Sequence, residues 1–486
     1  MKPSCQRCTK LGIECDGYDE KKPAVVIKKP VQRELRPKGC KATKDSNTGD
    51  SLPPIPAPIA YNPGGSPEDL QYFQYFQQVS VNELSGGWHE PLWNTYLLQA
   101  CHEMPFIQDM ALALAAQGRF ERLKHGIHPF ETAHQRRIYA MKKYSKSLAE
   151  IRRYLASASQ PDVRMFLLVS LLIYIFEFKQ GNMETAVRQV RSTLALFKNM
   201  RSIKSSVYVY NHHVRCPETL EDVIVDMVAR LDKQGFLLQA KQPSTKAERI
   251  PDVSVLGMSH QNPESTNVPT DFPNVFVARR YISFIQYWGR PNFASDAVKH
   301  ILRHVQKVQG KTVDGPDSGR IVSAREFSNR FLETKQWLTG IEKLFQRLQT
   351  LPSSDYRCAL SVKIQGLATL LVMACGIGFR LEARTNIALQ EVHTKYGSVR
   401  GLCEEMLRLG RMAVDDPAFL RCYVFDFGII VCILVILFAT NDPDLEKQTV
   451  KILRDMRPRK EGVWDSCVVT VMAETIVRSR STMQML

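Results

Sequence analysis

The sequence predicts an all-α fold, with a large multi-helix domain that follows a short cysteine cluster and a basic linker. From residue 66 onward, apolar residues recur at steps of three and four, and almost no segment alternates as a strand would. Prolines and glycines interrupt this pattern often enough to give helices of ordinary length; the breaks fall at Pro161, Gly181, Pro217, Pro273, Pro291, Pro352, Gly397 and Pro443. The predicted divisions are residues 1–20, a linker over 21–65, and an all-α domain over 66–486.

Three cysteines near the start of the chain have the spacing C-x2-C-x6-C. In such a pattern Cys5 and Cys8 can hold one metal ion from the first turn of a short helix, and Cys15 can close back on it. Tetrahedral zinc takes four ligands, so the sequence predicts a half-built zinc site. Cys40 is a weak candidate for a fourth ligand, because it lies too far along the chain for a usual spacing.

A basic, proline-punctuated segment follows the cysteines and shows no helical period. Its cations are opposed from residue 21 onward by only Glu34 and Asp45, and the segment predicts either a nuclear-import and phosphate-binding arm or a solvated linker. Six cations are predicted to contact DNA phosphates: Arg7 and Lys10 inside the cysteine cluster, and Lys21, Lys22, Lys28 and Lys29 in the basic segment. We expect the linker to be disordered.

Residues 46–67 are rich in proline, glycine, serine and asparagine and predict a domain boundary. The first helix of the domain is predicted directly after Ser66, which is a good N-cap. Pro67 at the first helical position and the acids Glu68 and Asp69 in the first turn favour the same start.

Further periodic segments extend the helical prediction along the domain. They are Met141, Tyr144, Leu148, Ile151 and Leu155; Leu220, Val223, Ile224, Met227 and Leu231; Ile282, Ile285 and Trp288; and Phe331, Leu338, Ile341 and Leu344. The longest apolar run, residues 427–439, is thirteen residues and too short to span a bilayer, which needs about twenty. We therefore predict a buried helix there and no membrane partner.

Composition bounds the function without deciding it. A net charge of +16 over 486 residues, with a pI near 9.3, favours a polyanionic partner as much as it favours a solvated basic surface. The twelve cysteines are scattered singly after Cys15, which is typical of a reducing compartment, and no secretory signal is recognisable.

No catalytic constellation is recognisable, so the chain is not predicted to be an enzyme. His300 and His304 have the spacing of a helical metal site but lack the intervening glutamate, and a solvated basic face is the favoured interpretation. Gly376-Ile377-Gly378 is only a fragment of a dinucleotide fingerprint. The segment from Arg457 to Trp464 is compatible with an anion site, although a structural loop with a buried tryptophan is favoured.

The cysteine spacing and its flanks, Lys2 to Cys8 and Leu11 to Tyr18, resemble the second half of the fungal binuclear zinc cluster. In order along the chain, further short segments resemble the middle domain of fungal transcription factors: residues 96–100, 110–116, 139–148, 176–182, 229–234, 278–279, Trp337, 425–430 and 459–466. After residue 430 the proline of the family pattern is replaced by Val431-Cys432-Ile433-Leu434, which predicts an uninterrupted helix.

The resemblance implies a nuclear, zinc-binding transcription factor acting on RNA polymerase II target genes, with DNA and transcription co-regulators as partners and a homodimer as a further option. It also implies that Cys5 is a bridging ligand and that Cys8 and Cys15 are terminal ligands. The first three cysteines of the family and its base-reading helix are absent from this sequence, so we expect weak, salt-sensitive DNA binding. The alternative is a regulatory protein of the same ancestry that does not bind DNA.

Overall fold

The computed structural model describes residues 65–124, 130–157, 163–193, 268–286, 293–310, 320–349, 353–382, 386–419 and 423–484, apart from positions 87, 89–90, 187, 191, 284 and 426–427. The chain divides into two units, residues 1–57 and 58–486, and every described residue belongs to the second. The divisions 1–20, 21–65 and 66–486 remain predictions.

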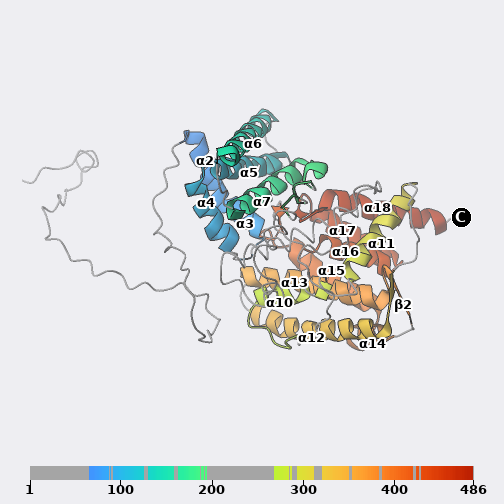
Figure 1. Cartoon of the computed structure of the whole chain (residues 1–486). Coiled ribbons are helices and arrows are strands. Elements are labelled where there is room, and N and C mark those ends of the chain that lie inside the picture. The colour runs from blue at the N-terminus through green and yellow to red at the C-terminus, as the bar shows by residue number, and fades with distance from the viewer. Residues whose placement is uncertain are drawn as a thin grey trace, which may run out of the picture. The chain divides into compact units, whose positions relative to one another are not determined.

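The described part of the second unit is 81% helical, so the predicted all-α class is confirmed for it (Figure 1). Its helices are α2 (Pro67–Tyr75), α3 (Val81–Ser85), α4 (Leu97–Glu103), α5 (Pro105–Lys124), α6 (Phe130–Ser157), α7 (Val163–Gln180), α10 (Val275–Ser283), α11 (Phe293–Val308), α12 (Ala324–Leu348), α13 (Ser354–Cys375), α14 (Ile387–Tyr396), α15 (Val399–Val414), α16 (Ile430–Ala439), α17 (Pro443–Asp455) and α18 (Ser466–Gln484). Short π-helical turns, η1 (Phe76–Ser80) and η2 (Leu92–Tyr96), lie between the first helices.

Several helices begin or end at the capping residues, prolines and glycines that the sequence indicated. The Ser66 hydroxyl accepts a hydrogen bond from the Asp69 amide and the Asp69 carboxylate returns one to the Ser66 amide, a capping box that starts α2 with Pro67 as its first residue. Pro443 starts α17 after the Asp442 cap, and Gly397 ends α14 with a positive φ of 72°. The predicted breaks at these positions are confirmed.

Helix α13 forms the centre of the C-terminal part of the unit and contacts α10, α11, α12, α14, α15 and α16. By length and composition alone it is apolar enough to cross a membrane, with a mean hydropathy of 1.7 over 18 residues. However, 83% of that window is buried inside the structure, as expected for the core helix of a globular protein. A single helix of this kind is weak evidence for a membrane, and the absence of a membrane partner stays a prediction.

The described residues also form two small sheets. Strand β1 (Arg320–Val322) pairs in parallel with β2 (Phe379–Leu381), with Ile321 opposite Arg380. Strand β3 (Tyr423–Val424) pairs in parallel with β4 (Lys460–Glu461), which pairs antiparallel with β5 (Trp464–Asp465). These strands have two or three residues each, so their formation depends on tertiary contacts more than on an alternating pattern.

The predicted helix faces agree with burial in most positions. Phe331, Leu338, Ile341 and Leu344 of α12 are all buried, and the predicted uninterrupted helix after residue 430 is confirmed as α16. Met141 departs from the pattern: it lies at the margin of the buried face of α6 and is 41% exposed. The periodic segment 220–231 lies outside the described residues.

Candidate functional site

The residues predicted to bind zinc and DNA all lie outside the described part of the chain. They are Cys5, Cys8, Cys15, Arg7, Lys10, Lys21, Lys22, Lys28 and Lys29. The zinc and phosphate contacts therefore stay predictions.

Helices α6 and α7 bring together two of the segments on which the family resemblance depends. The Tyr144 hydroxyl donates a hydrogen bond to the buried Glu177 carboxylate, and Asn182 Nδ2 donates to the other oxygen of Glu177 at 2.8 Å. The Tyr144 ring stacks on Phe176 with centroids 4.1 Å apart. Burial, together with the hydrogen bond to Glu177, raises the pKa of Tyr144 above its usual range, so the phenol stays protonated and serves as a fixed donor.

The acidic residue Glu121 of α5 joins segments that are far apart in the sequence. Its carboxylate is 2.6 Å from the Lys179 ammonium of α7 and 3.9 Å from the Lys460 ammonium of β4. Lys179 also lies over the Tyr423 ring, 5.1 Å from its centroid. Since Lys179 is almost fully buried, this pair serves as a structural junction and leaves no free charge for a ligand.

A second charged junction lies in the segment between α17 and α18. Glu461 is 1% exposed; it accepts hydrogen bonds from Arg459 Nε at 2.6 Å and from the Ile430 amide at 2.7 Å. Arg459 is also buried, with its guanidinium over the Phe419 ring at 4.4 Å and a hydrogen bond to the Phe419 carbonyl. Trp464 is 1% exposed, so the segment from Arg457 to Trp464 is a structural loop, as the favoured interpretation predicted.

A partly polar hollow among the described residues lies beside this junction. Trp88 forms part of its wall, with the Arg279 guanidinium 4.2 Å from the Trp88 ring centroid. Two further arginines line it, but Arg357 is paired with Asp416 at 2.6 Å and Arg459 with Glu461. Its cavity volume of about 20 Å³ has room for one or two water molecules, whereas pockets for small organic ligands measure several hundred Å³.

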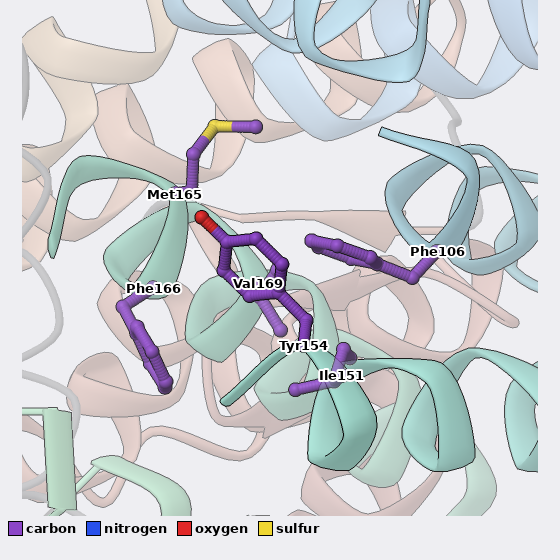
Figure 2. Close-up of a pocket in the computed structure, with 6 residues that line it drawn as sticks. All are labelled: Phe106, Ile151, Tyr154, Met165, Phe166 and Val169. Atoms are coloured by element: carbon purple, nitrogen blue, oxygen red, sulfur yellow. The ribbon is translucent and has the colours of Figure 1, made fainter. Parts of the chain in front are cut away.

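Two other hollows of the described helices are smaller still. One is lined by apolar side chains of α5, α6 and α7, and Figure 2 shows the Tyr154 ring between Phe106 and Phe166 there. The other lies beside Lys179 and Tyr423. Each has a cavity volume of about 10 Å³, which is enough for a single water molecule. None of these three hollows has the size of a substrate or cofactor pocket.

Both rings of the histidine pair in α11 lie edge-on to Phe438. His300 is exposed as predicted, but His304 is half-buried with its ring edge against Phe438, centroids 5.4 Å apart, so the prediction of a solvated face is wrong for His304. Burial lowers the pKa of His304, and the nearby cations Arg480, His300 and Lys307 lower it further. Among the described residues no group of three or more His, Cys, Asp or Glu side chains could hold a metal ion.

The glycine fragment Gly376-Ile377-Gly378 has a structural role. Gly376 has a φ of 63° and ends α13, and the turn leads directly into β2. A dinucleotide fingerprint would need a strand before the turn and a helix after it, and the order here is the reverse.

No sequence motif indicated the buried charges Arg279, Arg459 and Glu461 or the largely buried Glu121. Apart from the Arg459–Glu461 pair, their partners lie in distant segments, such as Trp88 for Arg279 and Lys460 for Glu121, so no local pattern indicated these contacts. The described residues form an all-α unit with charged internal junctions. None of the three hollows described above is large enough for a substrate. Comparison of the chain with protein-family models, curated proteins and solved structures finds no match.

Proposed function

We propose that this chain is a zinc-cluster-type transcription regulator of the nucleus, acting at RNA polymerase II target genes, in which Cys5, Cys8 and Cys15 hold zinc beside DNA. The observation that carries the proposal is the C-x2-C-x6-C spacing followed at once by a basic segment and then by a large helical unit. Thiolates at this spacing fit zinc, which would fix the loop between Cys5 and Cys15 and hold Arg7 and Lys10 in place.

The basic segment supplies the affinity for DNA in this proposal. Lys21, Lys22, Lys28 and Lys29, together with the two cations of the cysteine cluster, contact phosphates and release counterions without reading the sequence. The helical unit contributes regulation or partner binding. Its internal charges are paired at junctions such as Glu121 with Lys179, which supports a scaffold role over a catalytic one.

Zinc content tests the metal site directly. The purified full chain should contain zinc, and Cys5→Ser or Cys8→Ser should lower the metal-to-protein ratio at least severalfold, as measured by atomic emission. Cys467→Ser is the matched control, because Cys467 is a partly exposed thiol of α18 in the described helical unit. Equal zinc content in all three variants would contradict the assignment.

Salt dependence tests DNA binding. Six phosphate contacts predict a slope of about −5 for the logarithm of the binding constant against the logarithm of salt concentration. Replacing the four linker lysines, Lys21, Lys22, Lys28 and Lys29, with alanine should make the slope shallower by about 3 to 4. Affinity measured for several duplex sequences should vary little, and nanomolar binding with sharp sequence preference would contradict the model of phosphate contacts.

The alternative function is an interaction protein that does not bind DNA. One observation favours it: the described helical unit has an exposed basic and apolar face on α6 that is independent of the cysteine cluster. A chain that contains no zinc and binds no DNA, yet binds a protein partner, would support this alternative.

A further inference from the structure

The outward face of α6 carries a continuous line of exposed residues at steps of three and four. The line consists of Ile138, Lys142, Ser145, Ala149, Arg152 and Ala156. It extends over about 27 Å at 1.5 Å per residue, which is the length of a docked helix of five turns. Figure 1 shows α6 at the edge of the helical unit beside α5.

This face combines apolar side chains with positive charge. Ile138 is 55% exposed and Met141 is 41% exposed, which makes them two of the few large apolar side chains that the described residues leave in water. The helix carries seven Lys and Arg residues against two Glu residues. Small side chains at Ser145, Ala149 and Ala156 would allow a second backbone to approach closely.

The cations of α6 differ in how they are paired. Lys143 lies toward the body of the protein and pairs with Asp69 at 2.9 Å and with Asp109 at 3.1 Å. Lys146 pairs with Asp109 at 2.8 Å. In contrast, four exposed cations form no ion pair with any described carboxylate: Arg137, Lys142, Arg152 and Arg153.

The opposite side of α6 holds the helix firmly in place. Ala140, Tyr144, Ser147 and Ile151 are buried, and the Ser147 hydroxyl donates a hydrogen bond to the Phe106 carbonyl of α5 at 2.6 Å. Tyr139 stacks on Tyr72 of α2 with centroids 4.4 Å apart. The outward face is therefore presented on a fixed element, so a partner would bind it with little loss of conformational entropy on this side.

We propose that the outward face of α6 binds an acidic amphipathic helix of a partner protein. Charge complementarity identifies this occupant: carboxylates along the edges of the partner helix would pair with Lys142, Arg152 and Arg153. Its apolar residues would cover Ile138 and Met141 and pack over the small side chains between them. This binding is separate from the cysteine cluster and does not depend on zinc.

A protein helix fits the face better than a nucleic acid or a membrane does. Phosphate contacts use the cations alone and would leave Ile138 and Met141 without an apolar partner. A helix that lies in a membrane surface inserts a wide apolar face, and the apolar face of α6 is already buried against α5.

Fluorescence polarisation with the full chain tests the proposal. The probe is a labelled 20-residue peptide with leucine at steps of three and four and glutamate at the remaining positions. A peptide with the same composition in scrambled order controls for charge alone. We expect micromolar binding of the amphipathic peptide and at least tenfold weaker binding of the scrambled one.

Two variants separate the apolar and the charged contributions. Ile138→Ser with Met141→Ser removes the apolar contacts, and Lys142→Glu with Arg153→Glu reverses two charges; each pair should weaken peptide binding about tenfold or more. Lys447→Glu with Lys451→Glu makes the same charge change on exposed positions of α17 and should leave binding unchanged. Circular dichroism checks that each variant keeps its helix content.

Other outcomes overturn the proposal. Absence of peptide binding, or equal binding by the serine variant and the unchanged chain, would mean that the apolar residues bind no helix. The same chain is also tested with a DNA duplex and with an anionic phosphatidylserine vesicle. If one of them binds more tightly than the peptide, and only the α6 charge variant weakens that binding, the face belongs to that polyanion instead. Loss of zinc in the Cys5→Ser chain leaves peptide binding intact, which separates this test from that of the proposed function.

Discussion

Removing the Glu461 carboxylate should destabilise the helical unit more than removing any surface carboxylate. Glu461 is 1% exposed and accepts hydrogen bonds from Arg459 and from the first amide of α16, whose N-cap residue Ile429 provides no side-chain cap. Glu461 therefore both neutralises a buried guanidinium and places negative charge at the positive end of a helix. Its side chain lies so close to Gly428 that a Cβ there would be 2.1 Å from Glu461 Oε1.

The expected loss follows from these contacts. In Glu461→Ala the Arg459 guanidinium, which is 4% exposed, loses the carboxylate with which it forms an ion pair among the described residues. Leaving one member of a buried pair without its partner costs about 3–5 kcal/mol, and the lost charge at the helix terminus adds up to about 1 kcal/mol. Glu461→Gln keeps the shape of the side chain and should cost less than Glu461→Ala.

Urea unfolding followed by the fluorescence of the buried tryptophans Trp93, Trp337 and Trp464 measures the loss. The control is Glu474→Ala, which removes a partly exposed carboxylate 2.7 Å from Arg454 and should cost about 1 kcal/mol or less. Adding Arg459→Met to Glu461→Ala should restore at least about 2 kcal/mol, because it removes the unpaired charge. A double variant that is less stable than Glu461→Ala alone would refute the account of a buried unpaired guanidinium.

Two further perturbations test packing and pH dependence. Gly366→Ala places a Cβ 2.2 Å from the ring of the buried Trp337 and should lower the free energy of unfolding by about 2–3 kcal/mol; the matched Gly118→Ala, whose Cβ meets Tyr75 at 3.7 Å, should be neutral or stabilising. The pKa of His304 is lowered in the folded state, so the unfolded state takes up the proton first and stability should fall as the pH drops from about 7 through 6.5. His304→Leu should flatten the dependence of Tm on pH between 5 and 7, and an unchanged slope would exclude His304 as its source.

The helices were predictable because their causes are local in the sequence. A capping box at Ser66, a proline at position 443 and an apolar period through Phe331 and Ile341 each act over a few neighbouring residues. The two small sheets were not predictable in the same way. The two-residue strand at Lys460 and Glu461 pairs with the nearby Trp464 and Asp465 on one side, but its other partner, Tyr423 and Val424, lies far away in the sequence and is brought alongside by tertiary packing.

The internal charges were beyond sequence analysis for the same reason. Glu121 and Lys460 are separated by more than half of the chain, and nothing near either residue indicates that they meet. Met141 shows the converse: its position in the apolar period of α6 predicted burial, yet it is 41% exposed because the face against α5 is centred on Tyr144 and Ile151. A residue at the margin of an amphipathic face needs the neighbouring helix to decide its environment.

The paired internal charges and the exposed cations of α6 indicate where the function of the helical unit should be sought. Charges such as Glu121, Arg459 and Glu461 lie inside the protein, but each is paired there beside a hollow with room only for water. Their removal should therefore change stability. Four exposed cations of α6, among them Lys142 and Arg153, form no ion pair with a described carboxylate, and they lie near apolar side chains that folding leaves in water. A variant there should change binding while leaving stability within about 0.5 kcal/mol, since exposed substitutions rarely cost more. Measuring both quantities on the Glu461 and α6 variants separates the residues that build the unit from those that face a partner.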